Sequence, residues 1–238
     1  MPHFRLCLTV LEYSYEPARS LFTLERQSVC AIMGGGRIRL RTQHKEKSTR
    51  KIITTTWVTL DGFIAGPNNE MGFVGEVYDE AMGNYEYDLV SAADTLLLGR
   101  VTYESFAGAW PYVPDRPGAD PGEVAYARVL NAMRKIVFSK TLPSAEWNNS
   151  TLLREIVPEE IEQLKQEPGR DMVIYGSASI VQALTNYGLI DEYQVLVHPF
   201  LLGDGKPLFK NIKEKVKLKL VNTEARPSGV VVLTYQPK

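Results

Sequence analysis

From Lys51 onward, short apolar runs rich in β-branched residues alternate with amphipathic segments of helical periodicity. This alternation is typical of a sheet flanked by helices. The early runs are separated by helix-length segments and the last runs are not. We predict seven strands, at 52–60, 95–99, 135–139, 171–176, 191–200, 216–222 and 230–236.

Helices are predicted between the early strands, and their ends carry capping signals. The segment 78–93 has an apolar stripe and an acidic face; the acidic residues are Asp79, Glu80, Glu86 and Asp88, which we interpret as solvated. A second helix begins at Pro158, because proline suits the first helical position. A third has serines at 177 and 179 to cap its start and Gly188 past its end.

Residues 1–49 differ from the rest of the chain, with a Gly34-Gly35-Gly36 run followed by a cluster of basic residues. We predict that 1–49 is an N-terminal extension that is poorly ordered, and that 50–238 is one domain. A functional basic arm is the alternative. Met33 is an alternative start.

Composition excludes several classes of protein. The net charge of −1 gives no basic field for nucleic acid, and hydrophobic residues at 44% with charged residues at 23% match soluble globular chains. The sequence contains no signal peptide that we recognise and no apolar run long enough for a membrane span. Only Cys7 and Cys30 are present, so no disulfide framework is predicted and a cytoplasmic location fits best.

Three predicted strands end in segments suited to binding an anion. LLLGRVTYESF (96–106) places Gly99, Arg100 and Thr102 at a helix start, VFSK (137–140) ends in a hydroxyl and an ammonium, and YGSASI (175–180) opens a helix with small residues. Such junctions expose backbone N–H groups near a helix N-terminus. Each alone is also consistent with a helix cap, a surface turn or tight packing.

The three segments together resemble the cofactor-binding segments of dihydrofolate reductase. In addition, TTTWVTLDGFIAG (54–66) and LVHPFLLGDGKPLF (196–209) resemble the C-terminal reductase domain of bacterial riboflavin biosynthesis, the RibD C-terminal domain family. The resemblance spans about 51–236. It implies the dihydrofolate reductase-like three-layer α/β/α fold, with a mostly parallel central sheet and antiparallel C-terminal strands.

The resemblance also implies NADPH as the cofactor. By matched position, Gly99, Arg100, Val101 and Thr102 would hold the pyrophosphate and the 2′-phosphate side. Ser139 and Lys140 would hold the adenosine 2′-phosphate, and Gly176, Ser177, Ala178, Ser179 and Ile180 the pyrophosphate and nicotinamide ribose. One departure is Tyr175-Gly176, where dihydrofolate reductases usually have a Gly-Gly pair.

The substrate region departs further from folate reductases. Residues 66–77 lack their tryptophan-containing loop, and no carboxylate of 78–93 lies in their acidic motif. Asp61, in a Thr-Leu-Asp-Gly stretch like that of the riboflavin-pathway enzymes, and Trp110, which could stack on a flat ring, are the predicted substrate-binding residues. No catalytic residue and no metal site is identified, and His198 is interpreted as structural.

We therefore predict an NADPH-dependent oxidoreductase that transfers hydride to a small heterocyclic or ribosylaminopyrimidine-like substrate. A true dihydrofolate reductase, another small-carbonyl reductase and a non-catalytic NADPH-binding module are the alternatives. The predicted partner is a small-molecule substrate rather than nucleic acid or a membrane. The resemblance also implies a bacterial homodimer.

Overall fold

The structure is a computed structural model that describes residues 6–11, 26–32, 39–42 and 49–238, in two compact units, Met1–Ser48 and Thr49–Lys238. In the first unit, β1 (Leu6–Leu11), β2 (Arg26–Ile32) and β3 (Arg39–Thr42) form an antiparallel sheet in that order. The other residues before Thr49 lie outside the described part. The expected poor order of 1–49 therefore stays a prediction.

The second unit is built on an eight-stranded sheet of order β12-β13-β10-β4-β9-β6-β7-β8. From β10 to β8 every neighbouring pair is parallel, whereas β13 runs antiparallel to both β10 and β12. The predicted mixture of parallel and antiparallel strands is confirmed. The strands are β4 (Ile52–Thr59), β6 (Ala93–Gly99), β7 (Arg134–Phe138), β8 (Ser150–Leu153), β9 (Asp171–Tyr175), β10 (Glu192–His198), β12 (Leu218–Ala225) and β13 (Val231–Pro237).

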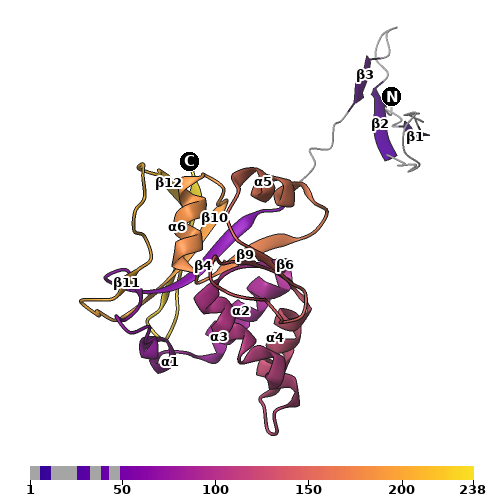
Figure 1. Ribbon diagram of the computed structural model, residues 1–238. Helices are drawn as coiled ribbons and strands as arrows, with labels where there is room; N and C mark the ends of the chain where they lie inside the picture. Colours follow the sequence, from indigo (N-terminus) through magenta and orange to yellow (C-terminus); the bar gives the residue numbers. More distant parts are fainter. Residues whose placement is uncertain (1–5, 12–25, 33–38, 43–48) are drawn as a thin grey trace. The chain divides into compact units, whose positions relative to one another are not determined.

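Helices cover both faces of this sheet, which confirms the three-layer α/β/α arrangement (Figure 1). One face packs against α5 (Pro158–Gln166) and α6 (Ala178–Asn186). The other packs against α2 (Glu80–Ala92), α3 (Arg100–Ala107) and α4 (Pro121–Ala132). The short α1 (Gly72–Glu76) precedes α2, and β5 (Phe63–Ala65) pairs with β11 (Lys206–Pro207). Within the described residues, no helix combines the length and apolar character that crossing a membrane requires.

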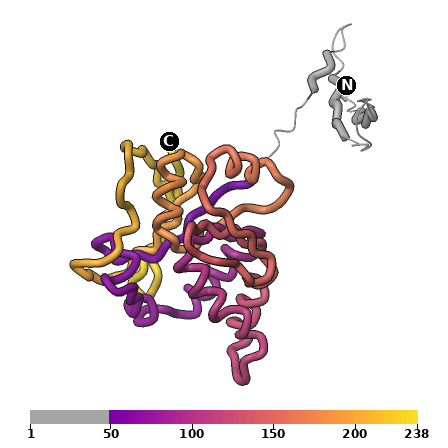
Figure 2. Tube along the Cα trace, in the orientation of Figure 1, coloured from indigo at the N-terminus to yellow at the C-terminus, as the bar shows by residue number. Residues whose placement is uncertain are grey.

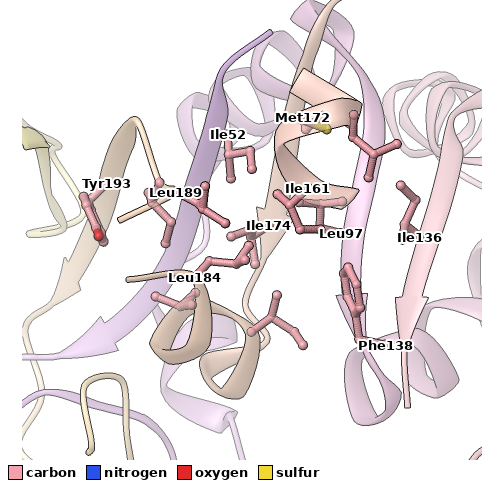
Figure 3. Close-up of a cluster of buried hydrophobic side chains, with 14 of the residues drawn as sticks. Ile52, Leu97, Ile136, Phe138, Ile161, Met172, Ile174, Leu184, Leu189 and Tyr193 are labelled. Carbon is pink, nitrogen blue, oxygen red and sulfur yellow. The ribbon is translucent and has the colours of Figure 1, made fainter. Parts of the chain in front are cut away.

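The two-residue period of a strand assigns its side chains to these two cores. In β6, Leu97 points into the core under α5 and α6, whereas Leu96 and Leu98 face the opposite layer. In β9, Ile174 lies in the first core and Tyr175 in the second. Figure 3 shows the first core, in which Leu97 and Ile174 meet Ile161 and Leu184 from the helices.

Two α-helices of the described domain, α1 and α4, were not predicted. Between β6 and β7 the sequence indicated a single helix, but the structure has α3, the 3₁₀ helix η1 (Trp110–Asp115) and then α4. The segment that joins α3 to α4 extends away from the sheet (Figure 2). The signal for α4 is Asp120-Pro121: Asp120 accepts N–H groups of the first turn and proline occupies the first helical position.

Candidate functional site

The three predicted anion-binding junctions follow three neighbouring strands, β9, β6 and β7. Gly99 is paired with Phe138 in the register of β6 and β7, and Leu97 is paired with Ile174 in β9. Because these strands are parallel, the residues that follow them emerge at one edge of the sheet. The fold therefore brings together segments that are about 40 residues apart in the chain.

The β6–α3 and β9–α6 junctions are joined by hydrogen bonds through Ser177. Its hydroxyl accepts the backbone N–H of Gly99 at 3.0 Å and donates to Oγ1 of Thr102, also at 3.0 Å. Gly176 has φ +58° and Ser177 has φ +45°, so two successive residues are left-handed. We call Gly99–Thr102 and Gly176–Ile180 the cradle.

The prediction that the side chain of Ser177 caps the start of α6 is wrong. Ser177 is the N-cap residue, but its side chain makes no capping hydrogen bond, because the hydroxyl is directed to Gly99 and Thr102 instead. The first N–H groups of a helix have no intrahelical partner. Those of Ala178 and Ser179 therefore remain available to an external acceptor.

The geometry of the cradle fits the diphosphate of a dinucleotide. A left-handed turn followed by helical N–H groups forms an anion-binding concavity. A Cβ on Gly99 would meet side-chain atoms of Ile180, Ser179 and Ser177 at 3.5 to 3.7 Å, which is ordinary van der Waals contact, so α6 lies against this position without requiring glycine there. Val101 is exposed beside these residues, which leaves the concavity open on the α3 side.

The cationic residues of this edge are exposed and paired locally. Arg100 forms an ion pair with Glu104 one turn along α3, at 2.8 Å, and Lys140 pairs with Glu155 at 3.2 Å. Exposed pairs of this kind contribute little to stability, so a phosphate could replace the carboxylates at small cost. Ser139 is buried, and its hydroxyl accepts the N–H groups of Thr141 and Leu142.

We expect Ser177→Ala to destabilise the protein by about 1 to 3 kcal/mol, because it leaves the buried N–H of Gly99 without a partner. Urea unfolding of the full chain measures this change. Ser179→Ala is the matched control, since Ser179 is exposed and makes no side-chain hydrogen bond in the described structure. Equal stability of the two variants would contradict the role assigned to Ser177.

A cavity of about 920 Å³ lies between the sheet and helices α2 and α4, and no cradle residue lines it. Trp110 lines it, as do four aromatic residues that were not predicted: Trp57, Tyr78, Tyr87 and Tyr126. We call this space the aromatic cavity. Trp110 and Tyr126 meet edge to face, with ring centroids 5.0 Å apart. The predicted position of Trp110 at a pocket wall thus agrees with the geometry, while its binding role stays a prediction.

Glu86 contradicts the prediction that the acidic residues of 78–93 form a solvated face. It lines the aromatic cavity but is only 5% exposed, and it receives hydrogen bonds from the hydroxyls of Tyr175 at 2.5 Å and Tyr78 at 3.0 Å. Burial raises the pKa of Glu86 to about 7, although these hydrogen bonds favour the carboxylate. Glu86 is therefore a carboxyl group that exchanges a proton near neutral pH.

The position of Glu86 follows from helix and strand geometry together. Met82, Glu86 and Val90 are the buried residues of α2, spaced four apart on one face. Tyr175 faces the same layer because of its place in β9, and the next residue, Gly176, belongs to the cradle. Glu86 and the cradle are thus connected through the C-terminal end of β9, because Tyr175 donates to Glu86 and the next residue, Gly176, belongs to the cradle.

Because the pKa of Glu86 is raised in the folded protein, the free energy of unfolding should depend on pH. Its folded pKa of about 7 lies above the ordinary value of 4.5, so the stability it contributes is fully present below pH 4.5 and is lost as the pH rises through 7. Relative to Glu86→Gln, the wild-type chain should lose up to about 3 kcal/mol between these limits. Urea unfolding across this range measures the loss. Asp88→Asn, at an exposed position of the same helix, is the matched control and should retain the loss of stability caused by Glu86.

Asp61 follows β4, the parallel neighbour of β9, and its carboxylate is already engaged by loop residues. Its carboxylate accepts hydrogen bonds from Thr59 Oγ1 at 2.5 Å and from the N–H groups of Leu202 and Gly203. These donors lower the pKa of Asp61. The geometry gives Asp61 a part in holding the 200–203 loop, and substrate binding stays a prediction. Buried His198 contacts Phe73 edge to face and the carbonyl of Leu196.

Among the described residues, no group of three or more His, Cys, Asp or Glu side chains could hold a metal ion. The candidate site consists of the cradle, the neighbouring cations and the aromatic cavity with Glu86. The cradle and cations offer N–H donors and positive charge to an anion, and the cavity offers aromatic walls and one buried carboxyl group.

Comparison with solved structures gives the same architecture. A Shewanella protein described as a candidate riboflavin biosynthesis protein has a TM-score of 0.62 at 20% identity, covering 79% of this chain and 99% of that chain. A Thermotoga maritima diaminohydroxyphosphoribosylaminopyrimidine deaminase/5-amino-6-(5-phosphoribosylamino)uracil reductase has a TM-score of 0.56 at 15% identity, covering 81% and 58%. At these identities the likeness establishes the fold.

Sequence comparison is more specific. The uncharacterized protein YyaP of Bacillus subtilis is 36% identical over 186 residues, which cover 78% of this chain and 94% of YyaP. YwjB of the same organism is 30% identical over 175 residues, covering 74% and 91%. The family model for the RibD C-terminal domain matches residues 50–232. The chain therefore belongs to the RibD C-terminal domain family, a family of reductases of the riboflavin-pathway type.

Proposed function

We propose that this protein is an NADPH-dependent reductase that delivers hydride to a carbon of a C=N or C=O group in a small, flat heterocyclic substrate. The observation that carries the proposal is the junction at the end of β9, where Tyr175 contacts Glu86 in the aromatic cavity and Gly176 begins the cradle. A substrate ring in the cavity would therefore lie next to a cofactor held in the cradle.

The cradle residues would hold the cofactor in the proposed complex. The N–H groups of Ala178 and Ser179 would donate to the diphosphate, and Arg100 and Lys140 would offer charge to the 2′-phosphate. Bound NADPH would supply the hydride, and the protein would hold the reacting carbons within about 3 to 3.5 Å.

Glu86 is the proposed proton donor. Reduction of a C=N or C=O bond adds a hydride to carbon and a proton to the heteroatom, so a proton source must be available in the cavity. A general acid works best when its pKa is near the working pH, and burial gives Glu86 that property. Tyr175 and Tyr78 would stabilise the carboxylate that remains after transfer.

A panel of assays tests this function. NADPH binding is followed by fluorescence, and NADPH oxidation is then measured with dihydrofolate and with the ribosylaminopyrimidine intermediate, both with and without its phosphate. Oxidation that depends on a heterocyclic substrate supports the proposal. Absence of NADPH binding would refute it. Binding without turnover on any panel member would favour a non-catalytic NADPH-binding module.

A further inference from the structure

We propose that the aromatic cavity selects a substrate ring that is neutral or positively charged and bears no phosphate or carboxylate. This inference rests on the proposed function, since it takes the cavity as the substrate site. It narrows the substrate class: a phosphorylated ribosylaminopyrimidine would be a poor ligand of this chain.

The first observation is the charge of the cavity wall. Apart from tyrosine, every ionisable side chain that lines it is a carboxylic acid, and none of the lining residues is lysine, arginine or histidine. The acidic residues are Asp79, Glu80, Asp120 and Glu123, together with Glu86, whose pKa of about 7 leaves it only partly charged at neutral pH. An anion placed among them would meet like charges and lose water without gaining a cationic partner.

The second observation is that both helix starts at the cavity are already capped. Helices α2 and α4 begin there, and such N-termini could otherwise bind an anion. Asp79 accepts the N–H of Met82 at 2.8 Å, and Asp120 accepts the N–H of Gly122, also at 2.8 Å. At α4, where Pro121 has no N–H, Asp120 takes the N–H groups of Gly122 and Glu123. At α2, Asp79 places a carboxylate at the helix start, where it repels an anion.

The third observation concerns the nearest cation. Arg116 lies at the neighbouring surface and forms an ion pair with Glu123, so its charge is compensated before any ligand binds. The aromatic walls then decide what the cavity does bind. Faces of tryptophan and tyrosine attract flat rings by stacking and cations by their quadrupole, and nearby carboxylates add to the second effect.

Three probes of matched ring size test the inference at neutral pH: N-methylquinolinium as the cation, quinoline as the neutral ring and quinaldate as the anion. Binding is measured by calorimetry on the full chain, with and without NADP⁺. We expect the cation to bind at least about tenfold more tightly than the anion, because like-charge contacts cost several kcal/mol. The preference should shrink at high salt.

Two variants connect the preference to the cavity. Glu80→Gln should lower the cation-to-anion affinity ratio, and Glu123→Gln should lower it more, because it also releases Arg116. Glu162→Gln is the matched control, since this exposed residue belongs to α5 on the opposite face of the sheet. An unchanged ratio in both cavity variants would overturn the inference.

The outcomes separate the two proposals. Equal or tighter binding of quinaldate, or no binding of any of the three rings, would overturn the charge selectivity even if NADPH is oxidised with another substrate. A clear cation preference in a protein that does not bind NADPH would support the selectivity and refute the reductase. Turnover of the ribosylaminopyrimidine only when it carries its phosphate would support the reductase and overturn the selectivity.

Discussion

Replacing Glu86 by glutamine is expected to lower the rate of NADPH oxidation about 100-fold, because general acid catalysis by a positioned side chain contributes about 10²- to 10⁴-fold. Glutamine preserves the size of the side chain; its amide oxygen can accept a hydrogen bond from one of Tyr175 and Tyr78, and its NH₂ group can donate to the hydroxyl oxygen of the other, but it has no proton to transfer at neutral pH. NADPH affinity should stay unchanged, since the cradle is untouched. Steady-state kinetics and fluorescence titration measure the two quantities.

The pH profile distinguishes proton donation from a structural role. The wild-type rate should fall as the pH rises through 7, because the pKa of Glu86 is about 7 and the carboxylate cannot donate. Glu86→Gln should lack this decrease. Asp88→Asn is the matched control on the same helix, because Asp88 is exposed and does not line the cavity. A variant rate within about threefold of wild type would show that Glu86 is not the proton donor.

Neutralising Arg100 and Lys140 together is expected to weaken NADPH binding about 100-fold and to leave NADH binding nearly unchanged. The two cofactors differ only in the 2′-phosphate, and each charge-assisted hydrogen bond contributes about 1.5 to 3 kcal/mol. Both side chains are exposed, so only part of that energy is expected. The double variant Arg100→Gln/Lys140→Gln and fluorescence titration with both cofactors provide the measurement.

The control variant also removes two positive charges, at positions outside the cradle. Arg128→Gln/Lys219→Gln neutralises one exposed arginine on α4 and one exposed lysine on β12, away from the cradle. Its NADPH affinity should stay within about threefold of wild type. If the Arg100→Gln/Lys140→Gln variant bound NADPH and NADH equally more weakly, the two cations would not recognise the 2′-phosphate. They would instead bind the diphosphate or attract both cofactors by long-range electrostatics.

Local patterns were sufficient for much of the domain. Strand positions followed from runs of β-branched residues, and Gly188 has the left-handed conformation expected past the end of α6, with φ +68°. The cradle segments were visible because the junctions, each ambiguous alone, occur together in the order found in a known family. Helix α4 was not predicted, although Asp120-Pro121 marks its start and Tyr126, Ala127 and Leu130 recur at helical spacing on its buried face.

Local residue patterns were sufficient to predict seven of the eight strands of the main sheet, the family and the junctions that form the cradle, because these signals lie within a few residues of one another, whereas β8 was missed. The burial of Glu86 could be seen only in the folded domain. A helix carries both a buried and an exposed face, and which face a carboxylate occupies depends on partners far along the chain. Tyr175 lies 89 residues from Glu86, and no local pattern pairs them. The aromatic cavity arises in the same way, from β4, α2, η1 and α4 meeting on one face of the sheet.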